Sequence, residues 1–149
     1  MTIFRMGALA LAGGALLAAG AATAQGDDLA FIGTSMFGNQ EVGHEGAGDN
    51  ASGDFSAELD MKAGQMCYML EVDGLDDFAA AHIHKAKAGE NGPPVVTLEL
   101  LGEDGEDVCV AVDPELLKDL AKNRADYYVN VHTAAFPAGA IRGQLGVEE

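Results

Sequence analysis

Apolar and polar residues alternate in several short segments of the chain, and a period of two is typical of half-buried β-strands. In the first of these segments Phe55 and Leu59 share one face, while the serine and the glutamate between them point the other way. A turn at 61–65 leads to a second apolar run at 66–72. The pattern therefore predicts an antiparallel hairpin over 53–72.

Similar patterns recur along the rest of the chain, between polar loops rich in glycine, aspartate and proline. They predict five further strands, over 79–84, 95–101, 108–112, 126–133 and 140–147. Residues 25–54 differ, because glycine, aspartate, asparagine and serine dominate them after a short apolar start at 29–32. We expect the segment 43–54 to be a loop or a bulged edge.

One short helix is predicted over 114–122. Asp113 can cap its N-terminus, Pro114 suits its first turn, and Glu115 adds negative charge at the positive end of the helix dipole. Three leucines at helical spacing form an apolar stripe, and Asn123 marks the end of the helix.

The predicted elements indicate an all-β fold. Short strands at a spacing of about 10 residues, with a single helix, favour an antiparallel β-sandwich or barrel. Strands and helices do not alternate, and the sequence contains neither a glycine-rich phosphate loop nor a Gly-x-Ser-x-Gly elbow. Nucleotide-binding and conventional hydrolase functions are therefore not expected.

The N-terminal segment 1–24 is predicted to be a signal peptide. Arg5 gives a positive start, residues 6–22 are almost entirely Ala, Leu and Gly, and Ala-Thr-Ala at 22–24 resembles a signal-peptidase site. A retained membrane anchor is the alternative, although about 17 apolar residues are few for a bilayer. Cleavage would leave residues 25–149 (149 − 24 = 125 residues), which suit one domain without a membrane span.

Acidic residues dominate this remaining chain. The whole sequence contains 8 Lys and Arg against 24 Asp and Glu, so removal of Arg5 leaves a net charge of −17 (7 − 24). Such a surface repels nucleic acid and anionic lipid, and it attracts cations. We therefore expect no nucleic-acid partner.

The two cysteines, Cys67 and Cys109, both lie in predicted strands. In an oxidising compartment an even pair indicates a disulfide, which places the protein in the periplasm or outside the cell. The bridge would close a loop of about 43 residues and contribute roughly 4 kcal/mol in the chain-entropy model. A pair of metal-binding thiolates is the alternative.

Three of the four histidines lie on polar faces of predicted strands. His82 and His84 are two residues apart, so they share a face, and His132 shares its face with Tyr128 and Asn130. If the two polar faces meet, three imidazoles converge. The alternative is that exposed strand faces carry histidine without a function.

Three neutral imidazoles suit a transition metal. Copper and zinc both accept such ligands, and copper is generally held more tightly by nitrogen. A fourth ligand would come from water, an acid or His44, which lies in the glycine-rich segment. We therefore expect His82, His84 and His132 to bind a metal ion, copper rather than zinc.

Two stretches carry a family resemblance: "CYMLEVDGLDDFAAAHIHKAKAGENGPPVVTLEL" and "YYVNVHTAAFPAGAIRGQLG". They resemble the CHRD domain, the module named after chordin and common in exported bacterial proteins, over residues 40–146. The resemblance implies that residues 25–149 form one CHRD domain with an immunoglobulin-like or superoxide-dismutase-like β-sandwich. It does not settle an activity, because the family has no generally agreed biochemical role.

The sequence also shows a more distant similarity to copper–zinc superoxide dismutases. Those enzymes use a His-x-His strand and a later strand histidine as copper ligands, with a C-terminal arginine that guides superoxide; here His82, His84, His132 and Arg142 match them. The loop after the His-x-His strand contains no histidine, so the dismutase zinc site is absent. Arg142 is thus a catalytic residue only if the protein is dismutase-like. Otherwise we expect it to pair with an acid or stack on a tyrosine.

These observations favour an exported single-domain protein that binds copper for storage, delivery or sequestration. The first alternative is a non-catalytic adhesion or protein-interaction module, with a protein partner outside the cytoplasm. The second is a dismutase-like redox enzyme. We expect binding rather than catalysis.

Overall fold

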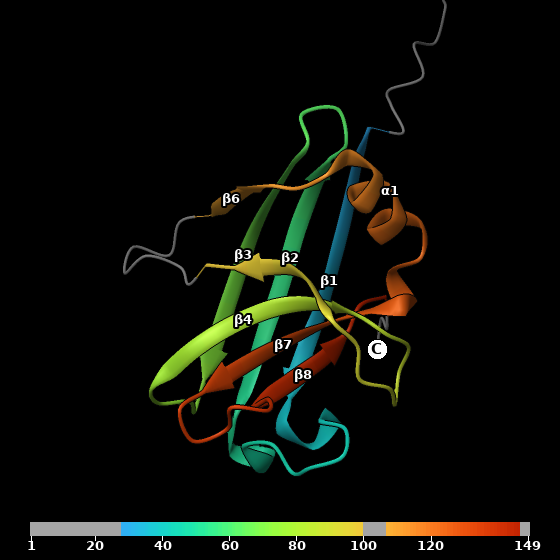
Figure 1. Cartoon of the computed structure of the whole chain (residues 1–149). Coiled ribbons are helices and arrows are strands. Elements are labelled where there is room, and N and C mark those ends of the chain that lie inside the picture. Colours follow the sequence, from blue (N-terminus) through green and yellow to red (C-terminus); the bar gives the residue numbers. More distant parts are fainter. Residues whose placement is uncertain (1–27, 100–106, 147–149) are drawn as a thin grey trace, which may run out of the picture.

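The computed structural model describes residues 28–99 and 107–146, and Figure 1 shows their arrangement. The first strands are β1 Leu29–Phe37, β2 Ser52–Asp60, β3 Gln65–Asp73 and β4 Phe78–Lys85. The later elements are β5 Pro94–Leu98, β6 Val108–Ala111, α1 Pro114–Lys122, β7 Tyr127–Thr133 and β8 Ile141–Gln144. Short 3-10 turns lie at Gly38–Gln40, Gly48–Asn50 and Arg124–Asp126.

The eight strands form an antiparallel sheet in the order β5-β4-β7-β8-β1-β2-β3-β6. β1 pairs with β2 over its whole length, but it meets β8 through only one residue pair, Phe37 with Arg142. The sheet therefore folds at this junction into two half-sheets. Figure 1 shows β4, β5, β7 and β8 crossing in front of β1, β2 and β3. The predicted all-β sandwich is confirmed.

The core lies between the half-sheets and is built by the alternation of the strands. Phe55 and Leu59 point into it from β2, and Ile83, Val129 and Val131 face them from β4 and β7. All five side chains are buried. A shift of the strand register by one residue would turn these apolar side chains from the core to the solvent. Burial of one face of each strand therefore determines which residues lie on the outer face.

The N-terminal strand β1 is the main departure from the sequence prediction. The sequence indicated only a short apolar start at 29–32, but nine residues form a strand. Ile32 and Met36 are buried, while the Gly33-Thr34-Ser35 run between them carries no large apolar side chain and conceals the alternation. Nine residue pairs with β2 hold this weakly patterned segment in the sheet.

The predicted helix and its cap are confirmed. α1 spans Pro114–Lys122, and the Asp113 carboxylate accepts a hydrogen bond of 2.8 Å from the Glu115 amide. Leu117 and Leu120 are buried in the core. The helix is also tied to the end of β4, because Lys85 donates to the Asp119 carboxylate at 2.6 Å.

The disulfide between Cys67 and Cys109 is confirmed, and the alternative of two metal-binding thiolates is therefore wrong. The two residues lie directly opposite each other in β3 and β6, 42 positions apart in sequence. The bridge fastens the short edge strand β6 to the sheet. Residues 100–106 and the predicted signal peptide 1–24 lie outside the described residues.

No helix in the described part of the chain has the length and apolar character needed to cross a membrane.

Candidate metal site

Three histidines meet on the outer face of the front half-sheet. β4 and β7 are adjacent and antiparallel, with His82 opposite Asn130 and His84 opposite Tyr128. His132 lies opposite Ala80, one step further along the same face. As the sequence predicted, Ile83 and its neighbours in β7 point the other way, into the core. The pairing of β4 with β7 is what brings the two polar faces together.

The imidazole rings are close enough to share one ion. Each of the three residues offers a nitrogen, and these nitrogens all lie within 4.8 Å of one another. The ring centre of His82 is 5.5 Å from that of His84 and 5.2 Å from that of His132. The ring centres of His84 and His132 are 6.0 Å apart. Metal binding by this group stays a prediction, but the convergence that it requires is present.

Hydrogen bonds to the backbone fix which nitrogens are free. His84 Nδ1 lies 2.9 Å from the Gly92 carbonyl oxygen, and His132 Nδ1 lies 3.2 Å from that of Pro137. A carbonyl oxygen only accepts, so each Nδ1 carries the proton and donates. The Nε2 atoms of both rings are then left as lone pairs. This arrangement is usual for metal-binding histidines, whose other nitrogen is held by a carbonyl or carboxylate.

The free nitrogens are buried without a partner. His82 Nδ1, His84 Nε2 and His132 Nε2 are almost inaccessible and accept no hydrogen bond from any described residue. Buried polar atoms are normally satisfied, so three such atoms in one cluster require an explanation. A cation bound by these three nitrogens would satisfy all of them at once. The donor set is chemically suited to copper or zinc.

Burial also favours the neutral form of two of these rings. It lowers the pKa of His84 and the pKa of His132, while the carbonyls of Gly92 and Pro137 partly oppose the effect. The neighbouring His82 adds repulsion against a second positive charge. The neutral imidazole is the metal-binding form, so protons compete less with a cation here than at an exposed histidine.

A stack of three side chains supports the cluster from one side. The His84 ring lies parallel to the Tyr128 ring, with centres 4.8 Å apart and an interplanar angle of 10°. The Arg142 guanidinium lies 3.5 Å from the centre of the same Tyr128 ring. Because β7 lies between β4 and β8, the histidine and the arginine approach this ring from opposite sides. The sequence expectation that Arg142 stacks on a tyrosine is confirmed.

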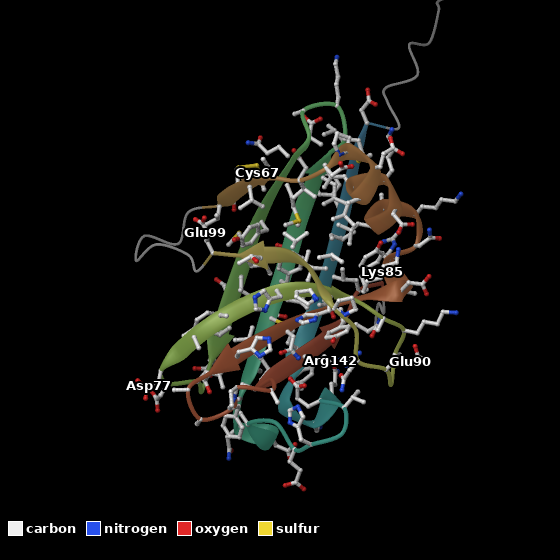
Figure 2. All side chains as sticks on the ribbon, viewed as in Figure 1. Cys67, Asp77, Lys85, Glu90, Glu99 and Arg142 are labelled. Atoms are coloured by element: carbon white, nitrogen blue, oxygen red, sulfur yellow. A yellow bond between two sulfur atoms is a disulfide. The ribbon has the colours of Figure 1, made fainter. Side chains whose placement is uncertain are left out.

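Arg142 also holds the loop that follows the histidine strand. It donates to the Glu90 carbonyl at 2.8 Å and to the Asn91 side chain at 3.0 Å. The next residue, Gly92, supplies the carbonyl for His84, and its amide donates to the Tyr128 hydroxyl at 3.3 Å. Figure 2 shows Arg142 and Glu90 as neighbours. The loop and the stack therefore position His84 together.

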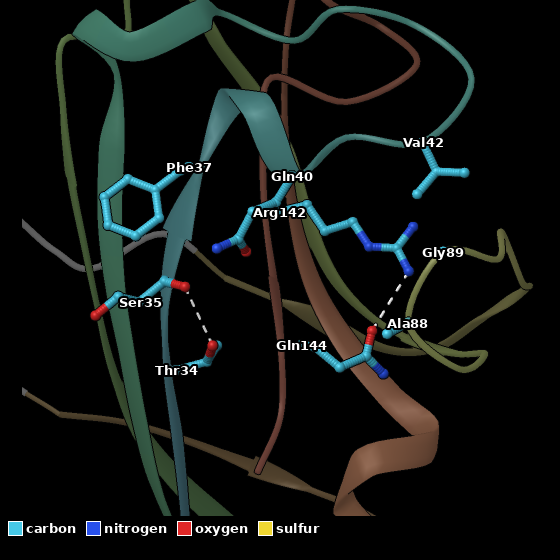
Figure 3. A pocket seen from close by; sticks show the side chains of 9 residues that line it. All are labelled: Thr34, Ser35, Phe37, Gln40, Val42, Ala88, Gly89, Arg142 and Gln144. Atoms are coloured by element: carbon cyan, nitrogen blue, oxygen red, sulfur yellow. Dashed lines mark hydrogen bonds between the residues drawn. The ribbon is translucent and has the colours of Figure 1, made fainter. Parts of the chain in front are cut away.

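A pocket of about 330 Å³ borders Arg142, and none of the three histidines lines it. Figure 3 shows the arginine extending toward Gly89 and Val42, with Gln144 beside it. Arg142 is only 2% exposed despite this opening, because Tyr128 and the loop cover it. The arginine is therefore part of the wall rather than a side chain free to move.

A buried acid, Glu41, contacts Asn130 beside the cluster, and the sequence did not single it out. The Glu41 side chain is 2% exposed, and Asn130, which pairs with His82 across the strands, donates to it at 2.9 Å. Burial raises the pKa of Glu41, while Asn130 and His44 oppose the rise. Nothing in the sequence distinguishes this glutamate from the exposed acids around it. Its environment comes entirely from the fold.

His44 is placed outside the group of three. Its Nε2 lies 3.6 Å from the Glu41 carboxylate, and its Nδ1 lies 3.2 Å from the Glu45 carbonyl. His44 therefore contacts the buried acid, and a role as fourth ligand stays a prediction.

Comparison with known proteins gives one match. The family model of the CHRD domain matches residues 32–145, which extends the 40–146 range expected from the motifs at its N-terminal end to include most of β1. No curated protein and no solved structure matches the chain.

Proposed function

The chain belongs to the CHRD domain family, and we propose, from the arrangement of its histidines, that it binds a transition metal ion, copper in preference to zinc. The observation that carries the proposal is the set of three buried ring nitrogens of His82, His84 and His132, none of which has a hydrogen-bond partner among the described residues. Nitrogen ligands favour copper over zinc at equal availability.

The surroundings fit a site that retains an ion rather than one that turns over a substrate. Arg142 is committed to Tyr128 and to the loop at Glu90 and Asn91, so we assign it to supporting the site. The strongly acidic surface concentrates cations near the protein. We infer storage, delivery or sequestration of copper.

The proposed location is the periplasm or the cell exterior. The Cys67–Cys109 disulfide supports this, because such bonds persist in oxidising compartments. The N-terminal segment 1–24, with its predicted cleavage site, agrees with it.

Equilibrium dialysis of the purified protein against copper(II), with metal analysis of both chambers, tests the proposal. We expect about one ion per chain, held through the three imidazoles. The double variant His82→Ala/His84→Ala should take up none at the same free copper concentration. Equal uptake by the two proteins would refute the proposal. Repeating the dialysis with zinc and with both metals together measures the preference.

The role of His44 is decided by a separate variant. If His44→Ala binds copper as tightly as the unaltered protein, the fourth position belongs to water or an acid. A weaker complex with an altered copper(II) spectrum would identify His44 as a ligand.

A further inference from the structure

The outer face of the rear half-sheet exposes a group of large apolar side chains. In the described part of the chain these are Leu29, Phe31 and Phe37 of β1 and Met69 of β3, with exposed fractions of 52%, 69%, 37% and 37%. The three residues of β1 point the same way, because they are separated by even numbers of positions. Exposed apolar residues scattered singly are ordinary, but Phe31 and Met69 line the same two depressions, and neighbouring apolar side chains of this kind indicate a binding surface.

Small residues leave a hollow between the side chains of Phe31 and Met69. The strand register places Gly33 opposite Ser56, and Ser56 opposite Met69. Phe31 lies one step along, opposite Glu58. Two shallow depressions adjoin here, and both are lined by Phe31, Ser56 and Met69. An apolar side chain of a partner can therefore lie between the phenylalanine and the methionine.

Carboxylates surround this hollow. Asp54, Glu58, Glu71 and Asp107 line the two depressions and are all exposed. None of them forms an ion pair with a lysine or an arginine among the described residues. The only basic residue in either lining is Arg124, at one end. The surface is thus apolar at its centre and negative around it.

We propose that this surface, called here the β1–β3 face, docks a basic segment of another protein. An apolar side chain of the partner enters the hollow between Phe31 and Met69, and flanking lysines or arginines lie against the carboxylates. The charge pattern supports this occupant, because complementary charges steer association and select the partner. A second copy of this chain would bring the same carboxylates together, and an anionic membrane would be repelled.

The proposal does not depend on metal binding. The β1–β3 face belongs to the half-sheet β1-β2-β3-β6, whereas the histidines lie on β4 and β7. The two surfaces are on opposite sides of the sandwich, since each is the outer face of its own half-sheet. Failure of one proposal therefore leaves the other intact.

The test uses a synthetic peptide with lysines on both sides of a Leu-Phe-Leu centre. Binding is followed by fluorescence anisotropy of the labelled peptide and by the methyl NMR signal of Met69. We expect saturable binding that weakens as salt is added, and a shift of the Met69 signal. The variant Phe31→Thr/Met69→Thr should bind at least about tenfold more weakly, a loss of about 1.4 kcal/mol. Both residues are exposed, so threonine is tolerated in these strands.

A pair of charge variants separates the local acids from the overall charge. Glu58→Gln/Glu71→Gln removes two carboxylates from the face and should weaken binding and flatten its salt dependence. Asp76→Asn/Glu115→Gln removes two exposed carboxylates elsewhere and changes the net charge equally. We expect the second variant to bind nearly as well as the unaltered protein.

Several results would overturn the proposal. These are a peptide affinity unchanged by Phe31→Thr/Met69→Thr, equal losses in the two charge variants, or a Met69 signal that does not move. Sedimentation showing that the protein dimerises through this face would assign it to a second copy. Binding to vesicles of anionic lipid that depends on Phe31 would assign it to a membrane.

Discussion

The guanidinium of Arg142 lies 3.5 Å from the centre of the Tyr128 ring, and the opposite side of that ring carries His84. One aromatic side chain thus connects a buried cation to a candidate metal ligand. The same arginine holds the loop whose Gly92 carbonyl fixes the proton on His84. Arg142 therefore supports the His84 imidazole in two ways, through the Tyr128 ring and through the loop that carries Gly92.

Replacing Arg142 should weaken metal binding without removing a ligand. In Arg142→Met the loop at Glu90 and Asn91 loses its donors, so His84 is no longer held in one orientation. Support of this kind typically changes metal affinity by about 10–100-fold. A competition titration against a copper chelator measures the effect. Arg142→Lys should restore little, because an ammonium cannot reproduce the stacked, forked contacts.

The control for this variant is Arg124→Met. Arg124 is exposed and lies outside the histidine cluster, so its loss should leave copper affinity unchanged. Equal copper affinities in Arg142→Met and the unaltered protein would show that the stack does not position His84.

A methyl group at Gly92 should disrupt the same imidazole through the backbone. A Cβ there would lie 1.9 Å from the carbonyl oxygen of Lys85, so the loop must shift and carry the acceptor of His84 with it. We expect Gly92→Ala to lower the free energy of unfolding by roughly 1–3 kcal/mol and to weaken copper binding as well. Ala88→Ser, an exposed change in the same loop, is the matched control. Denaturant unfolding and dialysis check both quantities, and a neutral Gly92→Ala would contradict the prediction.

The lowered pKa values of His84 and His132 predict a pH dependence of stability in the metal-free protein. Below the ordinary value of 6.5, the unfolded chain binds protons at these residues that the folded chain does not. The stabilisation is therefore fully present above pH 6.5, and it is lost as the pH falls through the lowered values of the folded state. Copper uptake should decline over the same acidic range, since protonated imidazole is not a ligand.

Urea unfolding at a series of pH values between neutral and mildly acidic measures this effect. The slope of stability against pH in that range should shrink in His84→Gln/His132→Gln. If the slope is the same in this variant, the two rings do not titrate as their burial implies.

Removing the disulfide should reduce stability but leave the metal site intact. Cys67 and Cys109 join β3 to the edge strand β6, on the half-sheet that does not carry the histidines. We expect Cys67→Ser/Cys109→Ser to lose roughly 2–4 kcal/mol of unfolding free energy and to retain one copper site of unchanged affinity. Thermal unfolding and dialysis provide the comparison. A loss of copper binding in the folded double variant would show that the disulfide half of the sandwich also supports the histidines.

Local features of this protein could be predicted from the order of its residues. The alternation in β2, β3, β4 and β7 located the strands and showed that His82 and His84 share a face, because side-chain direction follows from the period of two alone. Asp113 and Pro114 located the start of α1 for the same reason, since a helix cap is made within a few residues. The cysteine pair and the family motifs were also readable without coordinates.

Features that depend on contacts between residues distant in sequence could be seen only in the folded chain. The strand β1 forms because β2 pairs with it, although the run from Gly33 to Ser35 hides its pattern. The register of β4 with β7 brings His132 to the other two imidazoles, and the carbonyls of Gly92 and Pro137 then select the free nitrogens. The burial of Glu41 likewise results from contacts between distant segments, as does the choice of Tyr128 as the ring on which Arg142 stacks. Local patterns fix the face on which a side chain lies, but distance, burial and protonation depend on which segments the folded chain brings together.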